Sequence, residues 1–561
     1  MKKLPYGISN YEELIEDGYY YVDKTEYIEK LENLAEKRIM FLRPRKFGKT
    51  LFTSTLENYY DINKKEKFEK LYGQTYIGQN PTPLKNSYYI LRFNFSGINT
   101  ETEETTIHGF REKVDLGINK FVSKYNLEFY NNSNLTTEGL LNSVFEAFFI
   151  QKQGEKIYVI IDEYDHFANE LLSFNTSNFK NLVSKNGRVR KWYEILKEGT
   201  ESVVDWIFIT GVAPITLDSL TSGFNISKDI TKDVEFNEMM GFTQEELEKL
   251  MEEQKITKEE QKTLLPIMKE NYDGYKFALQ GKNKMYNTNM CLYLLTDYVR
   301  LKNIPKQLVD VNIASDYAKV GKMLDLYQGE KKQEIIEKMI TEKELISSIT
   351  EKFNPEIEFL EKELISMLFY LGYLTITGED FGIPKLKVPN KVIKNIYADY
   401  FMQILNKEAE FTVDDEQYNA IMREIALEGK IEKIVELLHQ YLNNLSNRDY
   451  QKFDEKYVKI IFYSIAMNLK TTYRVKSEFE VNRKYPDLLL IPKDQSKGYY
   501  GVMIEFKYLK AGEKEKLEEK QKEAKEQIKE YANFEEIKEI EKLKKYTAVA
   551  VNDEIYVEEC N

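Results

Sequence analysis

The chain has 561 residues, of which 42% are hydrophobic, 13% aromatic and 31% charged. At about 150 residues per domain, this length predicts three or four domains, and the apolar content excludes a wholly disordered chain. The net charge of -13 argues against a surface that coats nucleic acid non-specifically, although it leaves room for a local basic groove.

The sequence lacks the marks of membrane, secreted and zinc proteins. The longest uncharged stretch, Leu364 to Gly378, has 15 residues, fewer than the roughly 20 that a membrane-spanning helix needs. The N-terminus has two lysines but no apolar run behind them, which is wrong for a secretory signal. Two cysteines and three histidines cannot build a disulfide framework or the usual zinc sites. We expect a cytoplasmic protein without a membrane partner, whose metals bind carboxylates.

The first part of the chain, residues 1–240, predicts an α/β domain. Short apolar runs alternate with amphipathic stretches, which is typical of helices around a mostly parallel sheet. The expected strands are Arg38 to Leu42, Tyr88 to Phe95, Ile157 to Ile161 and Trp206 to Thr210, with a weaker fifth at Asp229 to Phe236.

Residues 241–450 predict a helical region, because long Glu/Lys-laced apolar periods dominate them. Within it, a helix followed by a hairpin at about residues 360–400 suggests a winged helix. This segment would either pack on the nucleotide face or contact a duplex through its basic side, which consists of Lys385, Lys387, Lys391 and Lys394. Residues 451–561 predict a second α/β domain, with strands near Thr472 to Glu480, Asp487 to Ile491, Gly501 to Tyr508 and Tyr546 to Val551.

A phosphate-binding loop is predicted between the first strand and the next helix. Residues 43–50 read Arg-Pro-Arg-Lys-Phe-Gly-Lys-Thr. Such a loop needs backbone N–H groups curled around phosphate, a lysine for the β/γ-phosphates and a hydroxyl for Mg²⁺. Lys49 and Thr50 fit the last two roles, and we also place Arg45 and Gly48 against the nucleotide. The consensus expects glycine at the position of Arg43, so the context has to decide.

Further along, the apolar strand Tyr158 to Ile161 leads directly into Asp162 and Glu163. NTP hydrolysis needs a Mg²⁺ ligand and a water-activating base at such a strand end, so the two motifs support each other. Thr210, at the end of another apolar strand, has a hydroxyl suited to sensing γ-phosphate, although an ordinary strand end explains it equally well.

A second candidate site lies near the C-terminus. Asp487 opens one strand, and Glu505 and Lys507 lie on one face of another, which a hairpin would bring alongside. Two carboxylates are hard ligands for Mg²⁺, which lowers the pKa of bound water, and an adjacent lysine can stabilise a pentavalent phosphate. This is the chemistry of phosphodiester hydrolysis. The bland alternative is a cross-strand ion pair.

These motifs resemble a known family. The N-terminal part looks like the AAA-ATPase-like family of bacterial and archaeal proteins, which often carry a PD-(D/E)XK nuclease-like domain at the C-terminus. An Arg-Pro-Arg loop start is itself typical of that family. The matching segments are 21–25, 43–50, 161–165, 210–211, 229–231, 241–243, 272–275, 372–374 and 388–390.

The resemblance implies ATP binding, with Lys49 and Thr50 on phosphate and Mg²⁺, Asp162 on Mg²⁺ and Glu163 as base. At the second site it implies Asp487, Glu505 and Lys507 as the nuclease motif, with Glu480 and Gln527 as auxiliary residues. The chain departs from the family at Lys276, where arginine is usual, and in having no glycine just before Asp487. An arginine finger has only Arg188 and Arg190 as candidates, on charge alone.

The sequence therefore predicts a P-loop ATPase of AAA-like fold joined to a restriction-endonuclease-like domain. ATP and Mg²⁺ are the expected cofactors, with Mn²⁺ as an alternative ion at the second site. The expected partners are nucleotide, DNA or RNA, and a second copy of the chain. Two alternatives stay open: a nucleotide-dependent switch with an inactive C-terminal module, and a protein that binds nucleotide without hydrolysing it.

Overall fold

A computed structural model describes most of the chain as two compact units. Its described residues are 2–129, 135–166, 188–215, 226–305, 307–310, 324, 332–341, 344–353, 360–408, 410, 413–449, 454–477, 485–552 and 554–560. Unit 1 contains residues 1–329 and 346–390, and unit 2 contains residues 330–345 and 391–561. Among the described helices, none is both long and apolar enough to cross a bilayer.

Unit 1 is built on a five-stranded parallel sheet in the order β2-β3-β4-β1-β5. Four predicted strands are confirmed: β1 (Arg38–Leu42), β2 (Tyr89–Asn94), β3 (Ile157–Asp162) and β4 (Val204–Gly211). The fifth differs, because β5 is only Lys228–Asp229, and the chain turns into the 3-10 helix η2 (Val234–Phe236) instead of continuing as a strand. The apolar runs of β3 and β4 are buried throughout, as expected for the centre of a parallel sheet.

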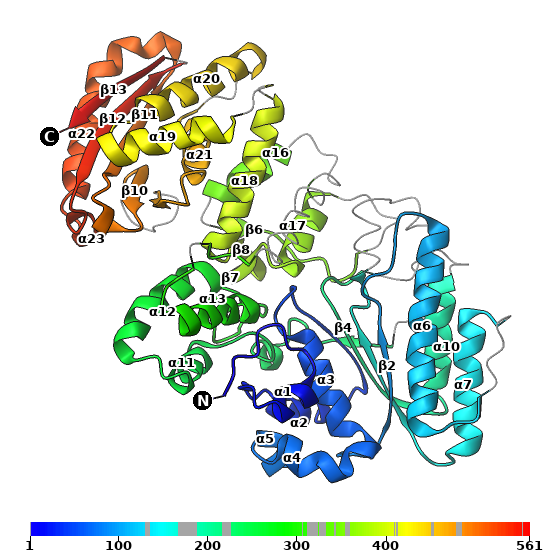
Figure 1. The fold of residues 1–561 in the computed structure, drawn as a ribbon. Coiled ribbons are helices and arrows are strands. Elements are labelled where there is room, and N and C mark those ends of the chain that lie inside the picture. The colour runs from blue at the N-terminus through cyan, green and yellow to red at the C-terminus, as the bar shows by residue number, and fades with distance from the viewer. Residues whose placement is uncertain are drawn as a thin grey trace. The chain divides into compact units, whose positions relative to one another are not determined.

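Helices cover both faces of this sheet (Figure 1). Neighbouring side chains of β2 point to opposite faces. Arg92 reaches α3 (Lys49–Tyr60), whereas Phe93 packs against Trp192 of α10 (Arg188–Gly199) and lies beside Gly117 of α6 (Glu103–Tyr125). Helix α7 (Thr137–Gln151) joins α6 and α10 on that second face.

Unit 1 also contains a three-stranded sheet and further helices. The helix-then-hairpin order predicted near residues 360–400 is confirmed by α17 (Glu361–Tyr370), β7 (Thr375–Asp380) and β8 (Ile383–Lys387), and the short β6 (Leu345–Ile346) pairs with β8. The other elements are α1 (Tyr11–Glu16), α2 (Glu26–Glu32), η1 (Ile62–Lys67), α4 (Phe68–Tyr72), α5 (Tyr76–Gln79), α11 (Gln244–Glu253), α12 (Lys258–Tyr272) and α13 (Thr288–Leu301).

Unit 2 contains a mixed five-stranded sheet in the order β13-β12-β11-β10-β9. Its strands are β9 (Tyr473–Lys476), β10 (Leu488–Pro492), β11 (Gly501–Leu509), β12 (Leu543–Val551) and β13 (Glu554–Cys560), and only β11 and β12 are parallel. Its helices are α16 (Lys332–Thr341), α18 (Lys391–Glu408), α19 (Asp415–Glu428), α20 (Glu432–Asp449), α21 (Glu455–Met467), η4 (Gln495–Lys497), η5 (Ala511–Lys516), α22 (Leu517–Tyr531) and α23 (Glu535–Lys538).

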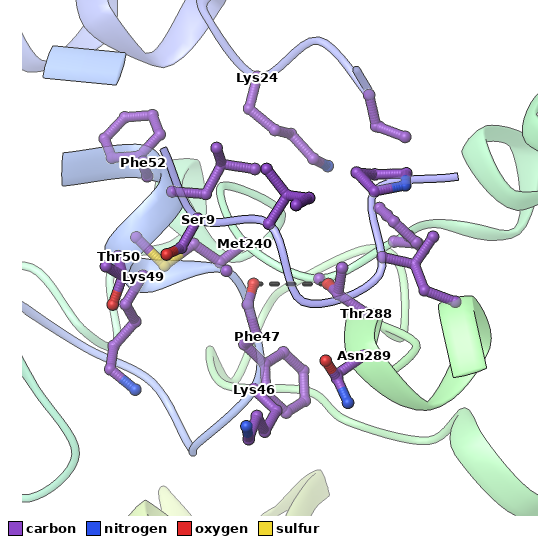
Figure 2. A pocket seen from close by; sticks show the side chains of 18 of the residues that line it. Ser9, Lys24, Lys46, Phe47, Lys49, Thr50, Phe52, Met240, Thr288 and Asn289 are labelled. Atoms are coloured by element: carbon purple, nitrogen blue, oxygen red, sulfur yellow. Dashed lines mark hydrogen bonds between the residues drawn. The ribbon is translucent and has the colours of Figure 1, made fainter. Parts of the chain in front are cut away.

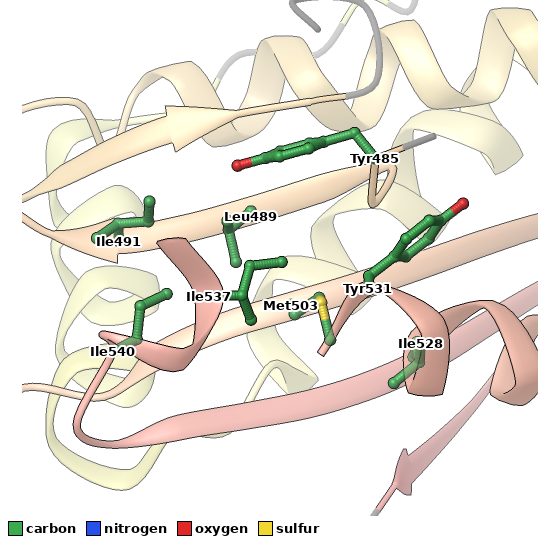
Figure 3. Packing of buried hydrophobic residues seen from close by; sticks show 8 residues of the cluster. All are labelled: Tyr485, Leu489, Ile491, Met503, Ile528, Tyr531, Ile537 and Ile540. Carbon is green, nitrogen blue, oxygen red and sulfur yellow. The ribbon is translucent and has the colours of Figure 1, made fainter. Parts of the chain in front are cut away.

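The Lys/Glu-rich helix α22 is not wholly solvated. Its apolar stripe, with Ile528 and Tyr531, packs with residues from α23 against Leu489 of β10 and Met503 of β11 (Figure 3). This packing covers one face of the sheet, the face that also carries Glu505 and Lys507 by alternation from Met503.

Candidate active sites

The predicted phosphate-binding loop lies between β1 and α3. Gly48 is the N-cap residue of α3 and has a φ of 99°, a left-handed conformation that glycine adopts without a steric penalty. Helix α3 begins at Lys49, so the unpaired N–H groups of its first turn face the loop. This strand-loop-helix arrangement is the geometry that phosphate binding at a helix N-terminus requires.

Lys49 is buried inside this loop. Its Nζ donates to the carbonyl oxygens of Arg43 at 3.0 Å and Pro44 at 3.1 Å. Burial lowers the pKa of Lys49, and the carboxylates of Glu163, Asp165 and Asp162 act in the opposite direction. The ammonium is thus held where a phosphate would replace the two carbonyls as its partner.

Arg43 occupies the position where the consensus has glycine, and its side chain points away from the loop interior. Its guanidinium donates to the carbonyls of Leu42, Thr231 and Phe236, each at 2.8 Å. It also lies 4.1 Å from the ring centres of Phe41 and Phe277. Burial lowers the pKa of Arg43 to about 9. The missing glycine therefore reflects a structural anchor rather than a lost phosphate contact.

Several motif segments far apart in sequence pack on the outside of the loop. The Phe47 carbonyl accepts a hydrogen bond from Gly241 N at 3.2 Å, and the Phe47 ring meets Tyr275 edge-on at 4.9 Å. A Cβ on Gly372 would lie 2.8 Å from a carbon of Pro44, so only glycine fits there. These contacts explain in physical terms why such motifs accompany the loop.

Asp162 ends β3 and Glu163 follows it, at the same edge of the sheet as the loop. Asp162 is fully buried, its Oδ2 lies 3.4 Å from both Arg92 and Asn94, and its Oδ1 has no hydrogen-bond partner among the described residues. Burial raises the pKa of Asp162, while Arg92 opposes that shift. Glu163 has a φ of 56°, which is uncommon for a non-glycine residue and occurs often at functional sites.

The ends of β3 and β4 are tied together next to these carboxylates. Asp165 accepts hydrogen bonds from Val212 N at 3.0 Å and Ala213 N at 2.7 Å, and burial raises its pKa. Thr210, near the end of β4, is fully buried, and its hydroxyl has no hydrogen-bond partner in the described part of the chain.

A cavity of about 490 Å³ joins the loop to these strand ends. Its lining includes Arg45, Gly48, Lys49, Thr50 and Glu163, whereas Asp162 and Thr210 are not part of it. Figure 2 shows the rest of the wall, which sequence reasoning missed: the N-terminal segment around Ser9 and Lys24, Met240, and Thr288 and Asn289 at the start of α13. Lys24 lies in the motif segment 21–25, and Met240 directly precedes the motif segment 241–243, whereas no motif signals Ser9, Thr288 or Asn289.

Of the two arginine-finger candidates, only Arg190 has a described side chain. Arg190 is buried and pairs with Glu194 on its own helix at 3.0 Å, so it does not present a guanidinium to a neighbouring subunit. The side chain of Arg188 lies outside the described residues.

Lys276, where the chain departs from the family, is held through its backbone, whose N–H donates to Thr375 Oγ1 at 2.7 Å.

The second site forms in unit 2 as the spacing predicts. Strands β10 and β11 pair Leu488 with Ile504, and Asp487 accepts a hydrogen bond from Phe506 N at 2.7 Å. Lys507 Nζ lies 2.9 Å from Glu505 Oε1. Asp487, Glu505 and Lys507 are all buried, with exposures of 6%, 2% and 5%, so this is not an ordinary ion pair on a solvated strand.

Sequence reasoning missed a fourth member of this site, Lys459 on α21. Its Nζ lies 2.7 Å from Asp487 Oδ1 and 2.9 Å from Glu455 Oε1, one turn earlier on the same helix. Lys459 itself is 8% exposed. A single lysine in an amphipathic helix carries no sequence signal of such a role.

The carboxylates fit a hard divalent cation that retains water ligands. Glu505 Oε2 is buried without a hydrogen-bond partner among the described residues, and burial raises the pKa of Glu505 while Lys507 lowers it. Within the described ranges, no three His, Cys, Asp or Glu side chains gather as a metal site. Mg²⁺ typically binds through one or two carboxylates plus water or phosphate oxygens.

The two auxiliary candidates differ in what the structure says of them. Gln527 lies on α22, which packs on β11, and its Oε1 is buried with no hydrogen-bond partner in the described part. Glu480 lies outside the described residues.

The basic side expected of residues 360–400 is only partly present. Lys391 donates to the Val475 carbonyl at 2.9 Å, and Lys394 is buried over the ring of Tyr463. These two lysines serve packing within unit 2, so the prediction of four lysines on a duplex is wrong for them.

Comparison with known proteins identifies two domains in the chain. A family model described as predicted AAA-ATPase matches residues 5–221, and one described as PD-(D/E)XK nuclease superfamily matches residues 453–559. The chain is also 28% identical over 249 residues to an uncharacterized protein in the vnfD 5′ region of Azotobacter chroococcum mcd 1. The match covers 44% of each chain, so the chain spans less than half of that relative. The protein therefore carries an AAA-ATPase-like domain followed by a PD-(D/E)XK nuclease superfamily domain.

Proposed function

We propose that unit 1 binds and hydrolyses ATP, and that unit 2 cleaves phosphodiester bonds in DNA or RNA under the control of that nucleotide. The observation that carries the first half is the cavity of about 490 Å³ shared by the phosphate-binding loop and Glu163. The second half rests on the buried group of Asp487, Glu505 and Lys507.

In unit 1, Lys49 binds the β/γ-phosphates, and Arg45 and the N–H groups behind Gly48 bind the phosphate chain. Thr50 and Asp162 would hold Mg²⁺, which when bound would neutralise charge on the phosphates. Glu163 orients and deprotonates the attacking water, and Thr210 senses the γ-phosphate. The unpaired Oδ1 of Asp162, among the described residues, supports the assignment of a cation next to it.

The test is equilibrium binding of MgATP to the Lys49→Ala variant. We expect affinity to fall at least about a hundredfold, because the buried ammonium proposed to bind the β/γ-phosphates is lost. Lys120→Ala, an exposed lysine on α6, is the matched control and should bind as the wild type does. Glu163→Gln should bind ATP normally and lose about a hundredfold or more in turnover. Unchanged binding by Lys49→Ala would refute the assignment.

In unit 2, Asp487 and Glu505 would hold Mg²⁺ or Mn²⁺, which when bound would supply a water of lowered pKa as the nucleophile. Lys507 stabilises the charge that develops on the phosphorane, and Gln527 with Glu480 completes the site. Lys507→Ala should therefore lose turnover without losing metal affinity, whereas Asp487→Asn should lose both.

A second candidate for unit 2 is an inactive interaction module. The observation that favours it is that both carboxylates already have lysine partners, Asp487 with Lys459 and Glu505 with Lys507. Such a module would bind no divalent metal at these residues. Isothermal titration with Mn²⁺ distinguishes the two candidates, because only the nuclease should bind the ion there.

A further inference from the structure

Lys459 is a buried cation that neither proposed reaction uses. It lies between two carboxylates, the buried Asp487 at 2.7 Å and the more exposed Glu455 at 2.9 Å. The side chain of Asp487 is 3% exposed and that of Glu455 is 39% exposed. The ammonium thus has one partner inside the site and one at its rim.

The charges explain what this arrangement does to a metal. Asp487, Glu505 and Glu455 carry three negative charges, and Lys459 and Lys507 carry two positive ones. A divalent cation on Asp487 and Glu505 would therefore have to enter next to two ammonium groups. Repulsion between the cation and an ammonium group bound to the same carboxylate is large in a site shielded from water.

We propose that Lys459 is an internal counter-cation of Asp487 that lowers the metal affinity of the free protein and shifts onto Glu455 when the metal binds. The inference rests on the proposed metal-dependent function of unit 2. It makes Lys459 a positioning residue, since it acts through Asp487. Glu455 lies within reach of the displaced ammonium and can pair with it. The exchange therefore leaves no unpaired buried charge, which would cost a large free energy.

The experiment measures Mn²⁺ affinity of the full chain, without nucleotide or nucleic acid, from the electron paramagnetic resonance signal of free Mn²⁺. Asp487→Asn defines binding elsewhere on the chain. Lys459→Met should bind at least about tenfold more tightly than the wild type, and Lys459→Arg, which keeps the charge, within about threefold of it. Lys470→Met is the matched control, because Lys470 pairs with Asp399 on the surface of the same unit, and it should leave affinity unchanged.

A double variant separates the role of Glu455 from direct metal binding. Glu455→Gln should weaken Mn²⁺ binding, because the ammonium loses its second partner. In the Lys459→Met background, the same substitution should have no further effect. A further loss there would show that Glu455 is a ligand and would overturn the exchange.

The remaining outcomes are distinct. Equal binding by the wild type and Lys459→Met, with loss in Asp487→Asn, would overturn the inference and leave the metal site intact. Absence of site-specific binding in every variant would overturn both the inference and the proposed metal-dependent cleavage. Lys459→Gln is a second neutral variant at the same position. If Lys459→Met and Lys459→Gln both fold poorly, Mn²⁺ should raise their melting temperatures more than it raises that of the wild type. A smaller or equal rise would overturn the inference.

Discussion

Arg43 illustrates how one side chain can be misjudged from sequence. Its position calls for glycine in a phosphate-binding loop, yet its guanidinium makes three backbone hydrogen bonds and lies between two aromatic rings. A planar fork with five donors can do this, whereas a lysine cannot. Arg43 therefore fixes the start of the loop from outside.

We expect Arg43→Met to lower the free energy of unfolding of unit 1 by about 3 kcal/mol, because three buried carbonyls lose their donor. Arg43→Lys should recover little of this loss. Both tryptophans, Trp192 and Trp206, belong to unit 1, so urea unfolding followed by tryptophan fluorescence reports on this unit alone. Arg45→Met is the control, with an expected change within about 0.5 kcal/mol. Equal losses in Arg43→Met and Arg45→Met would contradict the anchoring role.

Arg92 connects the two proposed Mg²⁺ ligands. It donates to Thr53 and Glu57 on α3, the helix that begins beside Thr50, and lies 3.4 Å from Asp162. We expect Arg92→Met to weaken binding of MgATP about tenfold while leaving metal-free ATP affinity nearly unchanged, because the Mg²⁺ ligands lose their alignment. Titrations with and without EDTA make the comparison. An equal loss in both conditions would indicate a general effect on folding instead.

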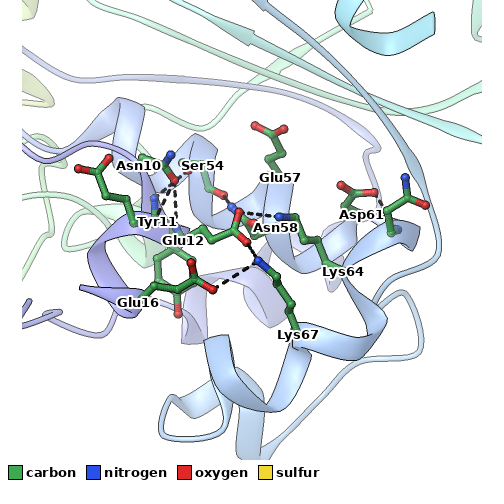
Figure 4. A network of polar contacts seen from close by, with 12 residues as sticks. Asn10, Tyr11, Glu12, Glu16, Ser54, Glu57, Asn58, Asp61, Lys64 and Lys67 are labelled. Carbon is green, nitrogen blue, oxygen red and sulfur yellow. Dashed lines mark hydrogen bonds and ion pairs between the residues drawn. The ribbon is translucent and has the colours of Figure 1, made fainter. Parts of the chain in front are cut away.

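At the scale of elements, helix α1 holds the N-terminal wall of the cavity in place. Glu12 of α1 accepts hydrogen bonds from Lys64 and Lys67 of η1, and Glu16 extends the network (Figure 4). Tyr11 N donates to Ser54 on α3, so the network lies directly behind the helix that carries Lys49 and Thr50.

The network predicts a pH dependence. Burial raises the pKa of Glu12, but hydrogen bonds from Lys64 and Lys67 outweigh it and lower the pKa below the usual 4.5. The contribution of Glu12 to stability is therefore complete above about pH 4.5 and is lost as pH falls through the lowered pKa. Glu12→Gln should cost about 1 kcal/mol or less at pH 7, since solvent screens this pair, and the difference should vanish in acid. A pH-independent difference for Glu12→Gln would argue against ion pairing.

The elements that sequence predicted correctly are those with strong local patterns. The buried apolar runs of β1 to β4 and the Gly-Lys-Thr helix start are local signals, and the structure confirms them. Strand β13 was missed because Glu554–Cys560 contains three glutamates, which an edge strand with an exposed face tolerates. The predicted fifth strand was too long, because Asp229 instead turns the chain by accepting from Thr231 N.

The site residues also divide into those that lie in local sequence motifs and those that only tertiary packing brings to a site. Lys49, Asp162 and Glu505 stand in recognisable motifs, so the sequence could place them. Lys459 and the cavity wall around Ser9 could not be found, because tertiary packing alone brings them to their sites.

At the scale of the whole molecule, the two proposed sites lie in different compact units, each with its own sheet. The division into segments 1–240, 241–450 and 451–561 stays a prediction. Because the residues of each site come from one unit, we expect Asp487→Asn to leave ATP binding within about twofold of the wild type and Lys49→Ala to leave Mn²⁺ affinity of unit 2 similarly unchanged. Titration with a fluorescent nucleotide measures the ATP affinity, and titration with Mn²⁺ measures the metal affinity. A large loss of ATP binding in Asp487→Asn would contradict this separation.

The most direct test is cleavage of end-labelled single- and double-stranded DNA and RNA, with Mg²⁺ or Mn²⁺ and with or without ATP. The wild type, Lys49→Ala and Asp487→Asn would be compared on each substrate. We predict that the wild type cleaves at least one substrate, that Lys49→Ala loses the response to ATP, and that Asp487→Asn cleaves none under any condition. Cleavage by Asp487→Asn at the wild-type rate, or no cleavage by the wild type on any substrate, would contradict the account.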